Sequence, residues 1–448
     1  MIEALRKLTN GKKVLILGYG REGRATWQLL CRAGGCKEIA IADRNEKLYE
    51  EGAVMHTGPD YLEHLEEYDL VFKTPGIVLP QPVSSYRCQI VSQTEVFFRR
   101  FRDQIVGITG TKGKSTTTTL LYHILKEAGK DCILAGNIGI PAFDMAEQVG
   151  KDTIIVFEMS CHQLEYLTVS PRIALLLNIH EEHLDHYGTM EKYVAAKHNI
   201  FLHQQPGDLF FCSEQCIPAE SGKGRRILVG DDTASAEVEL RTNQIFYKDQ
   251  CFSIDADNTP LLGHHNYYDI AFVYAVCQEF DISDEQFAKG LSTYQTLPHR
   301  LQLLGSLDGI CYYDDSISTI GDTTIQALKT LTDTDTVLIG GMDRGIDYSD
   351  LITYLSASSV PNIILMEETG RRIYEEIQKE WPAFAHKERL ILVHHLEEAV
   401  WKAKEVTRRG HSCVLSPASA SYGIFRNFEE RGEVFAQLVF GEHCTHKQ

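Results

Sequence analysis

Residues 105–116 read Ile105-Val-Gly-Ile-Thr-Gly-Thr-Lys-Gly-Lys-Ser-Thr116, and this stretch predicts the fold of the chain around it. The segment Ile105–Thr109 is mostly apolar or β-branched and predicts a buried strand. A glycine loop follows, and a helix-compatible segment then runs to Ala128, just before Gly129. A strand, a glycine loop ending in Lys-Ser and a helix form an arrangement whose successive backbone amides cradle phosphate groups.

The glycine spacing in this loop is shorter than in the common phosphate-binding loop. The usual pattern places a glycine five positions before the second one, but here that position is Ile108. What remains is Gly110-x-x-Gly113-Lys114-Ser115, in which the lysine would reach the terminal phosphates and a hydroxyl would complete Mg²⁺ coordination. We therefore predict ATP and Mg²⁺ binding by this loop. The residues expected around the nucleotide are Gly110, Thr111, Lys112, Gly113, Lys114, Ser115 and Thr116.

The composition of the whole chain excludes several classes of protein. Its 448 residues contain 44 Lys and Arg against 62 Asp and Glu, which gives a net charge of −18. Such an acidic surplus works against binding to nucleic acids or anionic membranes, which need a basic patch. Hydrophobic residues make up 43% of the chain and charged residues 24%, which is typical of globular proteins and excludes general disorder.

Apolar runs and amphipathic stretches alternate from one end of the chain to the other. This pattern predicts an α/β fold with mostly parallel sheets. A basic, irregular piece at 98–103 precedes the strand at Ile105, and the segment Leu297-Pro-His-Arg300 interrupts a helical stretch. We therefore expect three domains, at residues 1–100, 101–297 and 298–448.

Neither the start of the chain nor its cysteines indicate export or a membrane. Residues 1–10 contain no apolar run long enough for a signal peptide, and no later run of about 18 apolar residues could span a bilayer. The closest cysteine pairs, Cys31/Cys36 and Cys212/Cys216, have no CxxC partner set, so neither zinc nor a disulfide framework is indicated. We expect a cytoplasmic protein without a membrane contact.

A second glycine loop, Gly18-Tyr-Gly-Arg-Glu-Gly23, follows the apolar strand Lys13–Leu17. The acidic residue Asp43 ends the next strand, about 20 residues further on, as in dinucleotide-binding proteins. Taken alone, this pattern would indicate a nicotinamide-dependent oxidoreductase. The glycines could instead serve packing or hold another diphosphate, and nothing downstream resembles hydride chemistry.

Three further features suit a phosphate-transfer site. Glu158 ends an apolar strand, where a Mg²⁺-binding carboxylate would project beside the ATP loop. The run His180-Glu-Glu-His183-Leu-Asp-His186 fails the HExxH pattern, so its histidines serve either a metal or a polar loop. Lys197 shares a helix face with Tyr193 and is either a solvent-seeking lysine or one held near the phosphates.

The last third of the chain has three polar loops, each directly after a predicted strand. They are Asp314–Thr319, Gly340–Gly345 and Ser416–Gly423. Together they predict a binding crest for a polar ligand, although each loop alone would be ordinary turn chemistry.

The full set of motifs resembles the Mur ligase family, and within it the members that join glutamate to UDP-N-acetylmuramoyl-L-alanine. The resemblance covers essentially the whole chain and implies three domains: a Rossmann-like N-terminal domain for the UDP-sugar, a central ATPase domain and a Rossmann-like C-terminal domain for the amino acid. The motifs that carry it, in chain order, are Gly18–Gly23, Thr74-Pro-Gly-Ile77, Thr109–Thr116, Gly136-Asn-Ile-Gly139, Glu158-Met-Ser160, His183-Leu-Asp-His186, Ala196-Lys197, Gly263-His-His-Asn266, Leu297–Arg300, Asp315-Ser316 and Ser416–Ser421.

The resemblance implies an ATP-dependent ligase of peptidoglycan precursor synthesis, acting as a monomer. The substrate carboxylate would attack the γ-phosphate of ATP, and the amine of glutamate would then attack the resulting acyl phosphate. D-glutamate is the first expectation for the amino acid. Catalysis of this kind depends mainly on charge neutralisation and positioning.

Site residues follow from the motif positions. Lys114, Glu158, His183 and Lys197 would be catalytic, and Ser115, Glu158, His183 and Lys197 (as a carbamate) would hold metal ions. Asn266, Arg300 and Asp315 would join the ATP loop around the nucleotide. The UDP-sugar would be bound by Gly20, Arg21, Glu22, Asp43, Arg44, Gly76, Asn137 and His183. Glutamate would be bound by Thr319, Arg344, Ser421, Asn427 and Phe428.

Two departures from the family pattern bear on the amino acid. The usual Asp-Ser-Lys-Ala-Thr-Asn has Ile317 and Ile320 in place of the cation and the amide, and Arg344 stands where a lysine is usual. An apolar side chain cannot donate to a carboxylate, and arginine and lysine differ in carboxylate geometry. Both departures resemble a branch of the family that adds L-glutamate, which is the alternative. An oxidoreductase and a nucleotide-dependent switch protein are more remote alternatives.

Overall fold

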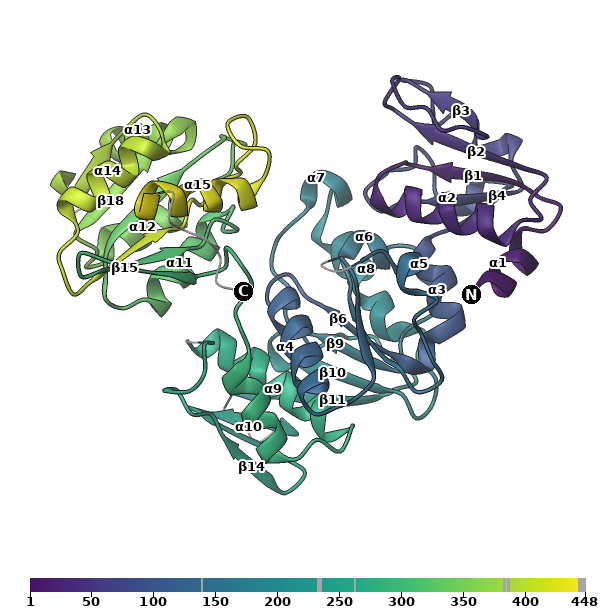
Figure 1. The fold of residues 1–448 in the computed structure, drawn as a ribbon, viewed down its shortest axis with the longest axis horizontal. Coiled ribbons are helices and arrows are strands. Elements are labelled where there is room, and N and C mark those ends of the chain that lie inside the picture. Colours follow the sequence, from purple (N-terminus) through teal and green to yellow (C-terminus); the bar gives the residue numbers. More distant parts are fainter. Residues whose placement is uncertain (138–139, 232–235, 262, 382–383, 385–386, 442–448) are drawn as a thin grey trace. The chain divides into compact units, whose positions relative to one another are not determined.

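Three sheets, each mostly parallel and each covered by helices, make up the computed structural model of the chain (Figure 1). The structure describes residues 1–137, 140–231, 236–261, 263–381, 384 and 387–441. The chain divides into two compact units, Met1–Tyr294 and Gln295–Gln448. The predicted α/β fold is confirmed, whereas the residue boundaries of three domains stay a prediction.

The first sheet has five parallel strands in the order β3-β2-β1-β4-β5. Strand order reverses between β1 and β4, and ligands of open α/β sheets bind outside the carboxyl ends of the strands at such a point. The strands are β1 (Lys13–Leu17), β2 (Glu38–Asp43), β3 (Val54–Thr57), β4 (Leu70–Lys73) and β5 (Gln89–Val91), with the helices α1 (Ile2–Thr9), α2 (Arg21–Ala33) and α3 (Gln93–Phe101).

The second sheet has nine strands in the order β14-β13-β12-β11-β10-β9-β6-β8-β7, and only β12–β14 pair antiparallel. The strands are β6 (Ile105–Thr109), β7 (Cys132–Gly136), β8 (Ile154–Glu158), β9 (Ile173–Leu176), β10 (Leu209–Ser213), β11 (Arg225–Asp231), β12 (Val238–Arg241), β13 (Gln244–Tyr247) and β14 (Gln250–Ser253). The helices are α4 (Lys114–Glu127), α5 (Ala142–Met145), α6 (Cys161–Leu164), α7 (Leu184–Tyr187), α8 (Met190–Leu202), α9 (His264–Gln278) and α10 (Asp284–Thr293).

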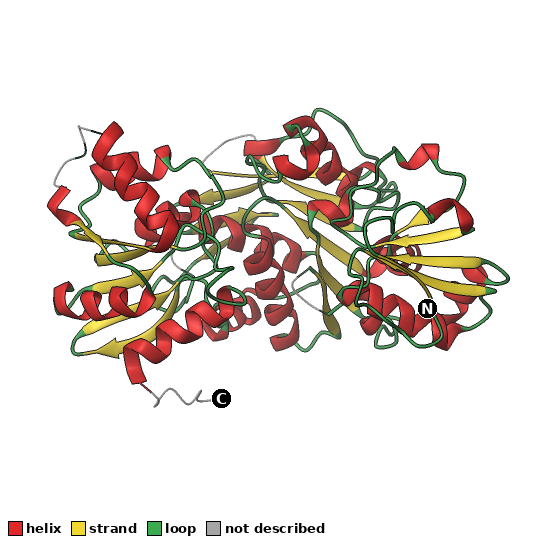
Figure 2. Cartoon of the chain, turned by 90° about the horizontal axis from the view of Figure 1, so that it is seen from above, coloured by secondary structure: helices red, strands yellow, loops and turns green. Residues whose placement is uncertain are grey.

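The third sheet forms the second unit, with six strands in the order β15-β16-β20-β17-β18-β19. Only the pair β15 and β16 is antiparallel. The strands are β15 (Gln302–Leu307), β16 (Ile310–Asp314), β17 (Thr334–Gly340), β18 (Asn362–Met366), β19 (Leu390–Leu392) and β20 (Ser412–Leu415). The helices are α11 (Gly321–Thr330), α12 (Ser349–Ala357), α13 (Glu367–Glu380), α14 (Leu396–Val406) and α15 (Phe428–Phe440), and Figure 2 shows helices on both faces of the sheets.

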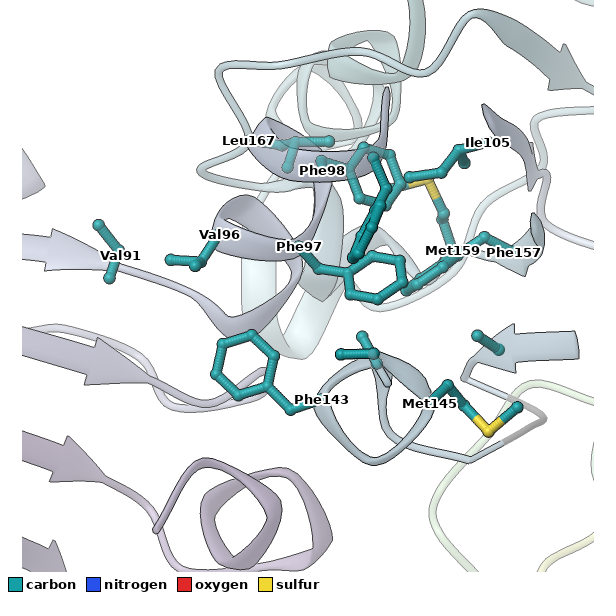
Figure 3. Close-up of a cluster of buried hydrophobic side chains, with 14 of the residues drawn as sticks. Val91, Val96, Phe97, Phe98, Ile105, Phe143, Met145, Phe157, Met159 and Leu167 are labelled. Atoms are coloured by element: carbon teal, nitrogen blue, oxygen red, sulfur yellow. The ribbon is translucent and has the colours of Figure 1, made fainter. Parts of the chain in front are cut away.

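One hydrophobic core joins the first two sheets, which is why they form a single unit. The cluster runs from residues of β1 and β4 through α3 to β8 and β9. Phe97 and Phe98 of α3 are fully buried, and their ring centroids lie 6.0 and 5.1 Å from that of Phe157 in β8. Figure 3 shows these rings turned toward one another, with Phe143 of α5 beside them. The N-terminal sheet is therefore held against the central sheet by packed aromatic side chains.

The elements predicted from apolar runs have the expected positions. Strands β1 and β6 have the predicted bounds, and Tyr193 and Lys197 share one helix as predicted, α8, which is capped by a hydrogen bond from Lys192 N to the side chain of Thr189. The antiparallel strands of the second sheet were not predicted. Among the described residues, no helix is both long enough and apolar enough to cross a membrane.

Candidate active site

The predicted ATP loop connects β6, in the interior of the second sheet, to α4. Gly113 has φ +79°, and a Cβ at this position would lie 2.6 Å from Oδ1 of Asp269 in α9. A Cβ at Gly110 would lie 3.0 Å from Cβ of Leu177. Both glycines are therefore required by close neighbours, and the loop has one tightly enclosed path. Thr116 is buried in the first turn of α4, directly after Lys114 and Ser115.

Two lysines converge on the carbonyl oxygen of Gly110. Lys114 Nζ donates to Gly110 O at 2.9 Å and to Thr111 O at 2.7 Å, and Lys197 Nζ donates to Gly110 O at 2.7 Å. Lys197 is 1% exposed, and its amine also lies 4.9 Å from the Tyr193 ring centroid. Burial, followed by the charge of Lys114, lowers the pKa of Lys197 to about 7. Burial likewise lowers the pKa of Lys114, against the opposing charge of Glu158.

The other loop residues are fixed by side chains that the sequence did not single out as partners. Thr111 Oγ1 lies 2.9 Å from Tyr193 Oη and accepts from His180 N at 2.9 Å. Lys112 N donates to Asn178 Oδ1 at 2.8 Å, while Lys112 Nζ lies 3.2 Å from Glu182 Oε1. Tyr193 and Asn178 lie 82 and 66 residues from their partners, so no local pattern connects them.

Glu158 lies at the carboxyl end of β8, beside the start of the loop. Its backbone pairs with Ile108 of β6, and Oε1 accepts from Asn137 Nδ2 at 2.7 Å. Its other oxygen, Oε2, is buried and has no hydrogen-bond partner among the described residues. A buried carboxylate oxygen without a donor is a ligand suited to Mg²⁺, which binds carboxylates together with substrate phosphates. The residues present therefore fit the predicted cation.

His183 lies in a cluster of aromatic rings. Its ring centroid lies 5.0 Å from that of His162, and its Nε2 lies 3.8 Å from Glu182 Oε2. His162 in turn lies 4.4 Å from His186, centroid to centroid. His183 has φ +58°, a left-handed backbone that is uncommon outside glycine and asparagine. Of the motif Gly136–Gly139, residues 138 and 139 lie outside the described residues.

The first glycine loop lies at the reversal point of the N-terminal sheet. A Cβ at Gly18 would lie 2.1 Å from Thr74 Oγ1, and Asp43 Oδ2 accepts from Tyr19 N at 2.8 Å. The second oxygen of Asp43 accepts from Asn45 N at 2.9 Å, so this carboxylate orders the turn. Gly20 precedes α2, Arg21 and Glu22 begin it, and Arg44 and Gly76 are exposed after β2 and β4.

Lys73 is a buried cation at this edge that the sequence analysis did not select. It ends β4, pairs with Leu17 next to Gly18 and is only 4% exposed. Its Nζ lies 4.9 Å from the Tyr166 ring centroid and donates a long 3.4 Å bond to Thr74 O. Burial lowers its pKa to about 8, against the charges of Glu165 and Glu22. A lysine closing an apolar strand directly before Thr-Pro-Gly is the signal that could have identified it.

Glu22 connects the two sheets of the first unit. Its Oε1 accepts from Gln163 Nε2 of α6 at 2.9 Å, and its Oε2 is buried without a partner among the described residues. Burial raises the pKa of Glu22. The UDP-sugar residues predicted on the N-terminal sheet therefore lie next to elements of the central sheet.

In the second unit, the three predicted crest loops follow β16, β20 and β17, which are adjacent strands. Arg344 Nη2 donates to Thr319 O at 3.0 Å, so two residues predicted to bind glutamate are in contact. Ser421 is buried two residues after Ser419. Asn427 Oδ1 accepts from Glu430 N and caps α15, and the Phe428 carbonyl accepts from Ser316 Oγ at 2.8 Å.

Asp315 is held rigidly within the crest. Its Oδ2 accepts from Ser318 Oγ at 2.6 Å and from Ser416 Oγ at 2.7 Å, and burial raises its pKa to about 6. Arg300 precedes Asp315 in the same unit, and its Nε is buried and has no partner among the described residues. Asn266 is in the first turn of α9, in the other unit. An ATP site that includes Asn266, Arg300 and Asp315 stays a prediction.

The loop after β6 has Lys114 and Lys197 on one of its carbonyl oxygens and a strand-end carboxylate beside it, which are the features expected of a nucleotide site in an α/β protein. Comparison with known proteins gives the family. Residues 108–277 match the Mur ligase middle domain. A UDP-N-acetylmuramoylalanine–D-glutamate ligase of Streptococcus agalactiae is 32% identical over 95% of this chain and 96% of its own length. The enzyme of the same name from Geobacillus kaustophilus is 32% identical over 96% and 97%.

A solved structure with a similar fold is the MurF ligase of Thermotoga maritima in complex with ADP. It is 16% identical, has a TM-score of 0.60 and covers 97% of this chain and 96% of its own. The chain belongs to the Mur ligase family, whose members are ATP-dependent ligases that form amide bonds.

The free oxygen of Glu158 leads to a test of metal binding. We expect Glu158→Gln to weaken binding of Mn²⁺, used as a spectroscopic substitute for Mg²⁺ in the presence of ADP, by at least about tenfold, because an anionic ligand is lost. Electron paramagnetic resonance of free Mn²⁺ measures the affinity.

The matched control for this experiment is Glu95→Gln. Glu95 is also buried, but both of its oxygens accept hydrogen bonds from Thr168. This variant should leave Mn²⁺ affinity unchanged. Equal affinities of wild type and Glu158→Gln would contradict the assignment of Glu158 to the metal.

Proposed function

We propose that the protein joins glutamate to UDP-N-acetylmuramoyl-L-alanine with hydrolysis of ATP to ADP and phosphate, and that it does so as a cytoplasmic monomer with Mg²⁺. The observation that carries this proposal is the convergence of Lys114 and Lys197 on Gly110 O beside the unpartnered oxygen of Glu158. Cations and a metal-binding carboxylate at one loop suit the transfer of a phosphoryl group between two anions. The names of the relatives support the choice of substrates.

The chain's own residues would act mainly by positioning and neutralisation. The loop amides and Lys114 would hold the phosphates of ATP, so that the carboxylate of the muramoyl substrate meets the γ-phosphorus in line. Ser115, Glu158 and His183 would hold Mg²⁺, which supplies charge neutralisation at the phosphoryl oxygens. An oxygen–phosphorus bond forms as ADP leaves. The glutamate amine then attacks the acyl carbon, loses a proton, and phosphate departs as the amide forms.

The first glycine loop would hold the diphosphate of the UDP-sugar. It lies at the sheet's reversal point, where α2 begins at Arg21 and directs its N-terminus toward the ligand edge. Lys73 adds a buried positive charge at the same edge. In a chain of net charge −18, such local cations must overcome a repulsive overall field.

The amino acid could also be L-glutamate, and one feature favours this second candidate. Ile317 and Ile320 replace a cation and an amide of the family pattern, and Arg344 replaces a lysine. Arg344 is fixed by its bond to Thr319 O, so its planar guanidinium faces a defined direction. D-glutamate remains the first candidate because the relatives carry that name.

The assay of phosphate release with each glutamate enantiomer tests the proposed function. With ATP, Mg²⁺ and UDP-N-acetylmuramoyl-L-alanine, we expect turnover to require glutamate and to be supported by one enantiomer, D-glutamate. Turnover with L-glutamate alone would establish the second candidate. Absence of phosphate release with both enantiomers would refute the ligase function, and NADH binding by fluorescence titration would favour the oxidoreductase.

A substitution of Lys197 tests whether this lysine forms the proposed carbamate. Burial lowers the pKa of Lys197 to about 7, which favours the neutral amine that can attack CO₂, forming an N–C bond and releasing one proton. We expect Lys197→Ala to lose roughly 10²-fold or more in turnover because a preorganised charge is removed. Acetate or formate should restore part of it by replacing the missing carboxylate. Lys114→Ala should be inactive without rescue, and wild-type turnover of Lys197→Ala would remove this role.

Lys73 gives a pH-dependent prediction. Its pKa of about 8 means that it is cationic below this pH and loses its charge above it. Binding of UDP-N-acetylmuramoyl-L-alanine should therefore weaken as pH rises through 8. Lys73→Met should bind about tenfold or more weakly at pH 7, because a charge-assisted hydrogen bond is lost, and should show no such pH step.

Isothermal titration calorimetry without ATP measures this affinity. The control is Lys13→Met. Lys13 is the first residue of β1, so it lies at the amino end of the parallel strands, away from their carboxyl ends, and its Nζ lies 3.4 Å from Glu38 Oε1. The control should keep wild-type affinity and its pH step. A Lys73→Met protein with both properties unchanged would exclude Lys73 from the UDP-sugar site.

A further inference from the structure

Arg431 of α15 is completely buried beneath the crest loops of the second unit. Its exposed fraction is 0%. Nε donates to Ser316 Oγ at 3.0 Å, while Nη2 donates to Ser316 O at 2.8 Å and to Ser419 O at 3.0 Å. Ser316 belongs to the loop after β16 and Ser419 to the loop after β20. One guanidinium therefore joins two of the three crest loops directly.

The third crest loop rests against the same side chain. A Cβ at Gly341, just after β17, would lie 2.9 Å from Arg431 Nη1. Met342 N, the next residue along, donates to Ala420 O at 2.9 Å and so ties the β17 loop to the β20 loop. The loops after three adjacent strands thus all lie against the guanidinium of Arg431.

The charge of this arginine is only loosely compensated. The acidic groups that act on it are Glu367 and Asp314. Asp314 Oδ2 is bound to His299 Nδ1 at 2.6 Å, and Glu367 Oε1 is buried without a partner among the described residues. Arg431 Nη1 likewise has no partner in the described part of the chain. A buried cation with an unpaired donor lowers stability, so packing alone does not account for an arginine at this position.

Each anchor point of Arg431 lies close along the chain to a residue proposed to bind glutamate. Thr319 follows Ser316 by three residues, and Ser421 follows Ser419 by two. Arg344 follows Gly341 by three residues. Any displacement of the guanidinium would therefore shift all three ligand-bearing loops together.

We propose that Arg431 is a positioning residue for the amino-acid substrate: it fixes the three crest loops in the arrangement that binds glutamate, without touching glutamate itself. The inference rests on the proposed glutamate function of the crest. The planar fork of arginine supplies Nε and Nη2 in fixed directions, which a lysine ammonium cannot reproduce. A positive charge alone would therefore not fix the three loops.

The test is steady-state kinetics of Arg431→Lys with each substrate varied in turn. We expect KM for glutamate to rise about tenfold or more, because two of three charge-assisted bonds are lost, while KM for the UDP-substrate, whose predicted residues belong to the first unit, stays within about twofold. The ratio of turnover with D- and L-glutamate should also fall, because the loops that discriminate the enantiomers lose their fixed spacing. Thermal unfolding is measured in parallel.

The matched control is Arg408→Lys in the same unit. Arg408 Nε donates to Asp335 Oδ1 at 2.6 Å near the start of β17, at the end of the sheet opposite to the crest. This variant should lower the melting temperature and leave KM for glutamate and the enantiomer ratio unchanged. The comparison separates loss of stability from loss of positioning.

Ser316→Ala provides a second variant should Arg431→Lys fail to fold, because it removes the Oγ acceptor of Nε and leaves the arginine in place. It should show the same selective rise in KM, to a smaller extent. A rise in KM shared equally by glutamate and the UDP-substrate, or an unchanged KM for glutamate with only a lower melting temperature, would overturn the proposal. Wild-type protein without glutamate-dependent turnover would instead refute the crest's proposed function, a result visible before any variant is compared.

Discussion

The hydrogen bonds from Lys114 and Lys197 to the carbonyl oxygen of Gly110 are the interaction on which the first unit depends. Two ammonium groups on one buried oxygen repel each other and have lost much of their hydration, so the loop must hold them by geometry. That geometry needs Gly110 against Leu177 and Gly113 against Asp269, which requires β9 and α9 to be in place. A second hydrophobic core, which includes Leu175 of β9, Leu177 and Ile270 of α9, keeps these elements together. The positions of the charged groups at the site therefore depend on the packing of these elements.

The acidic surface and the buried cations act over different distances. A net charge of −18 acts over the whole molecule but is screened by salt within about 10 Å. Lys73 and Lys197 are buried and Lys114 is half-buried, and a charge that is withdrawn from water interacts more strongly with a nearby anion than it does in water. Burial lowers the pKa of each, which shows that the protein alone compensates these charges incompletely. An arriving phosphate would supply the missing negative charge.

Apolar runs made the strands predictable, whereas the contacts that complete the site were not. The bounds of β1, β4, β6, β18 and β20 follow from short buried segments that no polar residue interrupts. The roles of Tyr193, Asn178 and Arg431 depend on partners 66 to 115 residues away, which no local spacing encodes. The motif residues Asp43 and Asn427 were predicted as ligands, and the structure shows an additional local reason for each: one orders a turn and the other caps a helix.

The loop after β16 carries isoleucines at positions 317 and 320, and other groups fix its path. Ile317 contributes its backbone, whose N–H donates to His299 O at 3.1 Å, so a change of its side chain leaves the loop's path intact. Ser316, its neighbour, faces inward to Arg431 and to the Phe428 carbonyl. The inward side chain of Ser316 and the backbone of Ile317 thus fix the path of the loop, which does not depend on the side chain at position 317.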